Sequence, residues 1–161
     1  MRTTALLALL LVGCAHSTPA PAPSSPPPTP SLLASLERTP CFGVCPVYKV
    51  EVFTDGRVHW QGFRNVGQQG AAEAQLTDAQ LAQVRDAFAG AKYFELEGNF
   101  ACRETTDMPS AKTFYSDGTR SKSIDHYYGC ESPPGVAALK TLEDRLDEVL
   151  QTDSRWIHPA Q

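Results

Sequence analysis

Five cysteines are the residues of this chain whose type and spacing point most directly to chemistry: Cys14, Cys41, Cys45, Cys102 and Cys130. A cysteine thiol can be acylated, can form a disulfide, can ligate a metal ion, or can act as a redox-active nucleophile. An odd number of thiols cannot all pair, and an exported protein rarely keeps a spare reactive thiol. One of the five therefore needs a role of its own.

The amino-terminal segment is typical of an export signal. Arg2 and the amino terminus are positive, and residues 5–12 form an apolar run much shorter than the roughly 20 residues of a membrane-spanning helix. The following Leu11-Val12-Gly13-Cys14 resembles the lipobox of bacterial lipoprotein signal peptides. This resemblance implies a diacylglyceryl group on Cys14 and cleavage after Gly13, whereas an ordinary signal peptide with an incidental cysteine is the alternative. We therefore expect residues 1–13 to be a signal peptide and Cys14 to be lipidated.

A proline-rich stretch follows, and we expect residues 14–34 to be a lipidated tether. Residues 15–31 read AHSTPAPAPSSPPPTPS and contain no large apolar side chain that could enter a core. Such chains favour an extended conformation of about 3.1 Å per residue, so this tether could hold a domain roughly 50 Å from a bilayer. Ala15 stands where inner-membrane lipoproteins often carry Asp. The sorting rule of lipoproteins therefore implies the periplasmic face of the outer membrane.

Length and charge limit what the remaining residues can be. The chain has 161 residues, which is enough for one ordinary domain, and we expect it over residues 35–158. Its formal charge of −4 gives no basic surface for a nucleic-acid partner. The expected partners are the lipid bilayer, through acylated Cys14, and a protein of the cell envelope.

Two hairpins are predicted from alternating residues around Asp-Gly pairs. Residues 46–54 and 57–63 flank Asp55-Gly56, where a two-residue type I′ turn is expected because Gly tolerates positive φ. Residues 111–116 and 119–128 flank Asp117-Gly118 in the same way. A further extended piece near residues 65–70 has only a weak signal.

Helices with an apolar face are predicted over residues 77–92 and 135–151. Thr77 and Gln80 have the spacing of a capping box, and Pro133-Pro134 precede the second helix. Trp156 and Ile157 should fold back onto the body. The pattern predicts an α+β domain, an antiparallel sheet of four or five strands with two helices in the order ββαββα. The similar placing of Gly56 and Gly118 suggests a duplicated ββα unit.

The four cysteines of the domain are expected to form two disulfides, because thiols oxidise outside the cytosol. Three pairings are possible, and we favour Cys41 with Cys45, where Gly43 allows a tight turn, and Cys102 with Cys130. A zinc site is the first alternative, although the spacing between Cys102 and Cys130 is wider than zinc motifs use. A redox pair at Cys41 and Cys45 is the second. Redox motifs usually have two intervening residues at a helix start, and here three are followed by Pro46 and a strand.

Several stretches of the chain resemble a known family. They are Arg38-Thr39-Pro40-Cys41-Phe42-Gly43-Val44-Cys45-Pro46-Val47-Tyr48, then Asp55-Gly56 and Gly62, and the later Thr106-Asp107-Met108-Pro109. Over roughly residues 35–150 the chain is similar to the bacterial family called domain of unknown function 6438. The resemblance implies export and often lipidation, without an established activity. Cys102 and Cys130 lie outside the family pattern, which implies an added pair bonded to each other.

Few residues outside the cysteines are candidates for function. We take Tyr48, Asp107 and His126 as candidate ligand contacts, although Asp107 fits a turn and His126 has no evident partner. No Ser-His-Asp order, phosphate loop or histidine metal pair is present, so we expect no catalytic residue, metal or cofactor. The favoured function is a non-enzymatic binding or structural module of the cell envelope. The alternatives are an envelope enzyme or thiol-redox protein using Cys41 and Cys45, and an inhibitor-like module.

Overall fold

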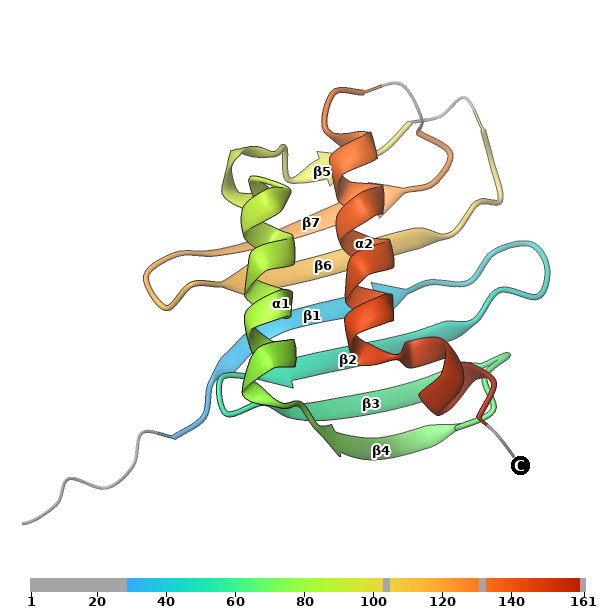
Figure 1. The fold of residues 1–161 in the computed structure, drawn as a ribbon. Coiled ribbons are helices and arrows are strands. Elements are labelled where there is room, and N and C mark those ends of the chain that lie inside the picture. Colours follow the sequence, from blue (N-terminus) through green and yellow to red (C-terminus); the bar gives the residue numbers. More distant parts are fainter. Residues whose placement is uncertain (1–28, 103–104, 131–132, 160–161) are drawn as a thin grey trace, which may run out of the picture.

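The computed structural model describes residues 29–102, 105–130 and 133–159, which form a twisted sheet with two helices lying across one of its faces (Figure 1). The sheet has seven strands in the order β4-β3-β2-β1-β6-β7-β5. Its strands are β1 (Leu32–Arg38), β2 (Val47–Phe53), β3 (Arg57–Arg64), β4 (Gly70–Gln75), β5 (Asn99–Phe100), β6 (Ser110–Ser116) and β7 (Ser121–Tyr127). The helices are α1 (Asp78–Gly90) and α2 (Val136–Leu150), with short helical turns η1 (Tyr93–Glu95) and η2 (Asp153–Ile157). Neighbouring strands are antiparallel except for β5 and β7, which are parallel.

The mixed α+β class is confirmed, but the prediction of four or five antiparallel strands in the order ββαββα was wrong. The observed order is ββββαβββα, so the suggested duplication does not extend to the order of the elements. Strand β1 begins at Leu32, three residues before the expected start of the domain at residue 35. A register shift between Leu32 and Ala34 buries both Leu33 and Ala34, which hides the alternation that marks a strand. Strand β4 was expected near residues 65–70 and lies later, because its Ala-rich sequence has little strand propensity.

Both predicted hairpins form, β2–β3 and β6–β7, but their turns are longer than two residues. In the first, Gly56 has φ +83°, while Asp55 is not among the residues with positive φ. A type I′ turn needs positive φ at both central residues, so that prediction was wrong. In the second, Asp117 accepts hydrogen bonds from the amides of Thr119 and Arg120, which stabilises a four-residue connection between β6 and β7. The Asp side chain supplies bonds that a shorter turn would make with its backbone.

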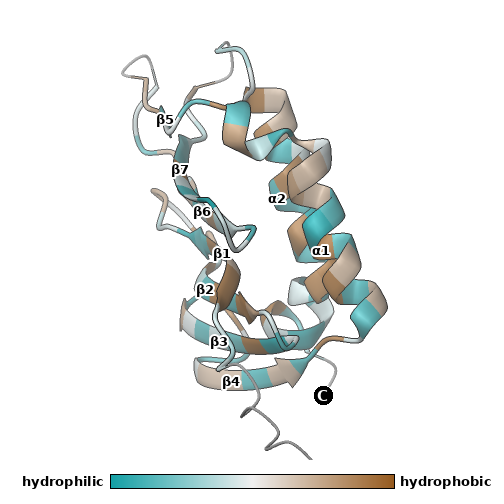
Figure 2. Ribbon diagram, turned by 90° about the vertical axis from the view of Figure 1, so that its left-hand side faces the viewer, coloured by the Kyte–Doolittle hydropathy of each residue, from teal (hydrophilic) through white to brown (hydrophobic). Residues whose placement is uncertain are grey.

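The core lies between the sheet and the helix pair, as the two layers in Figure 2 show. The Thr77 hydroxyl accepts from the amide of Gln80, and the Gln80 side chain accepts from the amide of Thr77, so the predicted capping box is confirmed. Apolar residues of α2 are buried against the strands, namely Val136, Leu139, Leu142, Leu146, Val149 and Leu150. Trp156 folds back as predicted, and its ring stacks on Trp60 with ring centroids 4.8 Å apart.

The strands have two distinct ends. One carries the connections of residues 54–56 and 117–120 together with the start of β1, and we call it the hairpin end, on the left in Figure 1. The other carries the connections of residues 39–46, 65–69 and 105–109, and we call it the disulfide end. Because β1 starts at the hairpin end, the chain enters the sheet on the side opposite the disulfide end. No helix in the described part of the chain has both the length and the apolar character that crossing a membrane requires.

Candidate functional site

The disulfide end brings together the two longest sequence stretches that carry the family resemblance. The amide of Thr39 donates to the carbonyl of Ser110 at 3.0 Å, and the amide of Ser110 donates to the Thr39 hydroxyl at 2.7 Å. The amide of Phe42 donates to the carbonyl of Asp107 at 3.1 Å. Residues 38–48 and 106–109 therefore form one surface, although they lie far apart in the sequence.

A disulfide between Cys41 and Cys45 closes the loop between β1 and β2. Their Cα atoms are 5.9 Å apart, and those of the second disulfide, Cys102–Cys130, are 5.3 Å apart, so the favoured pairing is confirmed. Gly43 has φ +153°, a backbone conformation that residues other than glycine rarely adopt. The four sulfur atoms are joined in pairs, which leaves none of them as a thiolate for zinc or for redox chemistry in this oxidised state.

An apolar patch surrounds this loop. Phe42 is 90% exposed and Val44 87%, and both lie inside the disulfide-closed loop. Phe63, near the end of β3, is 54% exposed, and Met108, just before β6, is 41% exposed. These are the exposed large hydrophobic side chains among the residues that the structure describes, and all of them lie at the disulfide end. Phe42 and Val44 share one closed loop, and exposed apolar side chains that lie together commonly mark an interaction site.

A cavity of about 290 Å³ opens beside the patch. We call it the disulfide-end cavity, and its apolar walls are Cys45, Pro46, Pro109 and Ile157 together with the rings of Tyr48 and Tyr128. Its polar lining is Arg38, Thr39, Ser110 and Asp147. Its volume lies at the lower edge of the roughly 300–1,000 Å³ usual for small-molecule pockets, so the cavity has room for a single side chain or a small ligand.

Asp147 of α2 organises the polar groups at the base of this cavity. It accepts from Arg38 Nη2 at 2.6 Å, from the Tyr48 hydroxyl at 2.5 Å and from the Thr152 hydroxyl at 2.8 Å. Burial raises the pKa of Tyr48, and the Asp147 carboxylate raises it further, so the hydroxyl stays protonated and donates. These bonds fasten α2 and the chain that follows it to β1 and β2.

A second set of bonds extends the network to β7. Glu143 is completely buried, with His126 Nδ1 2.9 Å from Oε1 and the Tyr128 hydroxyl donating to Oε2 at 2.6 Å. Arg38 Nη1 donates to the Tyr128 hydroxyl and lies 3.7 Å from Glu143 Oε2. Burial raises the pKa of Glu143, while His126 and Arg38 oppose this rise. Because these groups are bonded to one another, the network is suited to holding the cavity in shape rather than to transferring a proton to a ligand.

The three candidate ligand contacts lie in different environments. Tyr48 lines the cavity, as a contact residue would. Asp107 is exposed with φ +67°. Its carbonyl accepts from the Phe42 amide and its carboxylate accepts from the Thr106 hydroxyl, so these bonds are made within the disulfide end. His126 is only 2% exposed and has a partner in Glu143 that its own sequence neighbourhood does not reveal. Cys14 lies outside the described residues.

Sequence reasoning missed most of the network. Glu143 follows Leu139 by four residues and precedes Leu146 by three, so it falls within the apolar stripe of α2. A charged residue in such a stripe signals a buried partner, and this signal could have identified Glu143. Arg38, Tyr128 and Asp147 have no comparable local signal. No group of three or more His, Cys, Asp or Glu side chains in the described ranges is placed to hold a metal ion.

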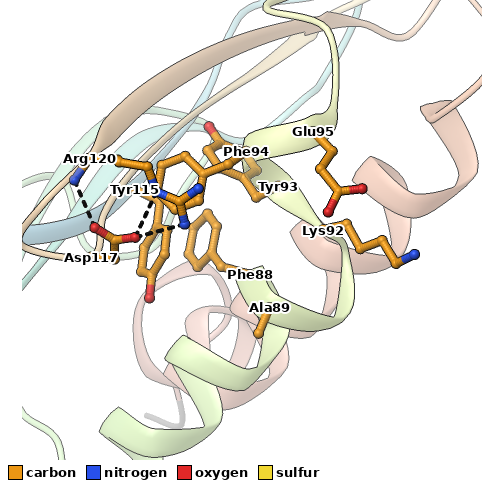
Figure 3. Close-up of a pocket in the computed structure, with 9 residues that line it drawn as sticks. All are labelled: Phe88, Ala89, Lys92, Tyr93, Phe94, Glu95, Tyr115, Asp117 and Arg120. Atoms are coloured by element: carbon orange, nitrogen blue, oxygen red, sulfur yellow. Dashed lines mark hydrogen bonds and ion pairs between the residues drawn. The ribbon is translucent and has the colours of Figure 1, made fainter.

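A cavity of similar size, about 290 Å³, lies at the hairpin end (Figure 3). Phe88 and Tyr115 stack in its wall with centroids 4.2 Å apart, and the Arg120 guanidinium lies 4.1 Å from the centre of the Phe94 ring. Arg120 is also paired with Asp117 at 3.0 Å. The Tyr93 hydroxyl donates to the carbonyl of Thr113, and burial raises the pKa of Tyr93 to about 12. These groups bond within their own neighbourhood, and none of the aromatic residues in this lining is among the exposed large apolar side chains of the described residues.

Comparison with known proteins finds a family but no individual protein. No curated protein matches the chain. A family model described as Domain of unknown function (DUF6438) matches residues 33–150, from the second residue of β1 to the last residue of α2. The match therefore spans both disulfides and Arg38, Tyr48, Tyr128, Glu143 and Asp147 around the disulfide-end cavity. The chain belongs to the DUF6438 family.

Proposed function

We propose that this chain is a lipid-anchored protein of the bacterial cell envelope, and that its domain is a non-enzymatic binding module acting through the disulfide end. The exposure of Phe42 and Val44 carries this proposal. Covering an apolar side chain of this size contributes roughly 1.5–3 kcal/mol, which the fold itself does not gain while the side chain faces water. Two such side chains on one closed loop favour binding as their role.

The rigidity of the loop supports binding rather than catalysis. The disulfide closes it, the amide of Gly43 donates to the carbonyl of Cys41, and Asn65 Nδ2 donates to the carbonyl of Cys45 at 2.9 Å. A preorganised loop loses little conformational freedom when it binds. The charged groups beneath it already pair with one another, whereas a catalytic acid or base needs an atom within reach of a substrate.

The anchor is supported by the sequence and agrees with where β1 starts. The lipobox-like Leu11-Val12-Gly13-Cys14 and the proline-rich residues 15–31 lead to the hairpin end, because β1 begins there. An anchored domain would then hold its apolar patch away from its own bilayer. Disulfides persist mainly outside the cytosol, which also favours the envelope.

The anchor is tested by metabolic labelling with a palmitate analogue in bacteria that express the full chain. We expect the wild type to be labelled and Cys14→Ala to be unlabelled. Cys41→Ala, which also removes a thiol but lies in the domain, is the matched control and should keep its label. Persistent labelling of Cys14→Ala would contradict lipidation at this residue.

The binding role is tested by a photo-crosslinking amino acid placed at position 42 or at position 119, which is exposed at the hairpin end. In intact envelopes we expect crosslinked adducts from position 42 and few from position 119. Equal yields from the two positions, or none from position 42, would contradict binding through the disulfide end.

A thiol-redox role is the second candidate, because Cys45 lines the disulfide-end cavity. Neither Cys41 nor Cys45 begins a helix, so no helix dipole lowers the thiol pKa there. After selective reduction of the folded protein, we expect both thiols to titrate near the ordinary cysteine pKa of about 8.5. A thiol pKa well below this value would favour the redox role over the structural one.

A further inference from the structure

We propose that the disulfide end binds a second copy of this chain, in a two-fold symmetric dimer in which Phe42 of each copy enters the disulfide-end cavity of the other. This inference rests on the binding role proposed above and names its partner. The partner follows from the shape of the surface, from the size of the cavity and from the rigidity of the loop.

A two-fold interface uses the same surface on both subunits, so that surface must be complementary to itself. The disulfide end meets this requirement because it carries a protruding side chain and a cavity side by side. Thr39 and Cys45 line the cavity, and the loop between them carries Phe42. When two copies approach about a two-fold axis, each offers the ring that the other can receive.

The cavity fits one apolar side chain. Its volume of about 290 Å³ lies at the lower edge of the range for small-molecule pockets, roughly 300–1,000 Å³, and gives room for one aromatic ring. Pro46, Pro109 and Ile157 give it apolar walls. The charged groups in its lining, Arg38 and Asp147, are paired with each other at 2.6 Å, so a phenylalanine ring would leave no ion without a partner.

Phe42 cannot fill the cavity of its own chain. The ring is 90% exposed, and the disulfide and the bond from the Phe42 amide to Asp107 hold the loop in place. The Phe42 ring can therefore enter such a cavity only in another molecule.

Charge and tether length both permit this dimer. Residues 39–48 contain no charged side chain, so two copies of the loop can meet without direct repulsion even though the chain carries a formal charge of −4. The two tethers would leave from opposite ends of the dimer. Each could reach roughly 50 Å when extended, which is enough for both lipid anchors to enter one bilayer.

Sedimentation velocity of the oxidised chain with Cys14→Ser, measured over a concentration series, tests the dimer without lipid. We expect a reversible monomer–dimer equilibrium. Phe42→Ala should weaken it about a hundredfold, with about tenfold for each of the two rings lost. Phe53→Ala, which removes a partly exposed ring at the other end of β2, is the control and should leave it unchanged. A wild type that stays monomeric, or a Phe42→Ala variant that dimerises as the wild type does, would overturn the proposal.

Complementation between two variants tests the arrangement of ring and cavity. Ser110→Phe fills the cavity but keeps Phe42, whereas Phe42→Ala keeps the cavity but lacks the ring. Each variant alone should be mainly monomeric. A mixture should form heterodimers, because the Phe42 ring of the Ser110→Phe chain can enter the open cavity of the Phe42→Ala chain. A mixture that associates no better than either variant alone would overturn the exchange of rings.

Crosslinking in the native envelope separates failure of this inference from failure of the proposed function. Cells express two differently tagged copies of the full chain, each with the photo-crosslinking amino acid at position 42. Adducts that contain both tags support the second copy as partner. Adducts that contain one tag joined to another protein would overturn this inference and leave the binding role intact. The absence of any adduct would overturn both.

Discussion

The disulfide end and the hairpin end of the sheet each carry a cavity of about 290 Å³, but their side chains are arranged in opposite ways. At the hairpin end, Arg120 pairs with Asp117 three residues away, and the aromatic rings stack on one another. At the disulfide end, Arg38 pairs with Asp147 across 109 residues of sequence, while Phe42 and Val44 face water. Local pairing is sufficient for the turn at one end, whereas the other end is held by contacts between distant elements.

This difference indicates which side chains stabilise the fold and which are available for binding. The described groups at the hairpin end pair with one another, and none of the exposed large apolar side chains lies there. The disulfide end keeps apolar side chains exposed on a rigid loop and supports the cavity below them with a buried ionic network. Changes to the network should therefore affect stability, and changes to the exposed side chains should affect association.

The largest effect is expected from Asp147→Ala, which removes the acceptor shared by Arg38, Tyr48 and Thr152. Removing one partner of a buried ion pair commonly lowers the free energy of unfolding by about 3–5 kcal/mol. Because Asp147 is partly exposed, we expect a loss at the lower limit, about 3 kcal/mol. Asp144→Ala, on the same helix and paired with exposed Lys140, should cost about 0.5 kcal/mol or less. Urea unfolding measures both free energies of unfolding. Equal losses would show that the network does not support the disulfide end.

A smaller effect is expected when the loop disulfide is removed by Cys41→Ser together with Cys45→Ser. In the chain-entropy model, closing a loop of this length contributes about 2 kcal/mol. The loss should be measurable by urea unfolding at neutral pH. It should be accompanied by weaker dimerisation, because Phe42 is then no longer held in place. A variant that loses stability but dimerises like the wild type would show that the closed loop is not what orients the ring.

Opposite pH dependences are expected at the two ends. Because burial raises the folded-state pKa of Glu143, its protonated form stabilises the fold. Relative to Glu143→Gln, the wild type should lose stability as pH rises from about 4.5 through the raised pKa. Asp117 has its pKa lowered to about 2 by hydrogen bonds from Arg120 and Thr119. Relative to Asp117→Asn, the wild type should lose stability as pH falls from about 4 towards 2.

Urea unfolding of the wild type and both variants between pH 2 and pH 7 measures these slopes, and the range is set by the pKa values of about 2 for Asp117 and above 4.5 for Glu143. Buried Glu143 and surface Asp117 should give pH dependences of the free energy of unfolding with opposite signs. The same sign for both would contradict this contrast.

The smallest effect on stability is expected from Phe42→Ala. The ring is 90% exposed, so its removal should change the free energy of unfolding by less than about 0.5 kcal/mol. Thermal unfolding below the concentration at which dimers form measures this value. A loss of several kcal/mol would mean that Phe42 serves the fold and not a partner.

The features that could be predicted from sequence are those made by near neighbours. Thr77 and Gln80 form their capping box, and the hairpins form around Gly56 and Gly118, because the atoms that bond lie within a few residues. The disulfide pairing was also accessible, since four cysteines allow only three pairings. Strand β1 was missed because its register shift breaks the alternation. Asp147 was missed because its partners in the strands, Tyr48 and Arg38, lie 99 and 109 residues away. The exposure of a loop side chain depends on what packs beside it in the fold, so the exposure of Phe42 could not be predicted from the sequence.

The central claim is that the disulfide end is covered by another molecule in the envelope and the hairpin end is not. Hydroxyl-radical footprinting of the anchored chain in intact envelopes, compared with the purified monomer, tests this most directly. Oxidation of Phe42 and Met108 should fall in the envelope, while oxidation of Phe94 and Tyr115, which line the hairpin-end cavity, should stay the same. Equal oxidation of Phe42 in the two samples would contradict the account.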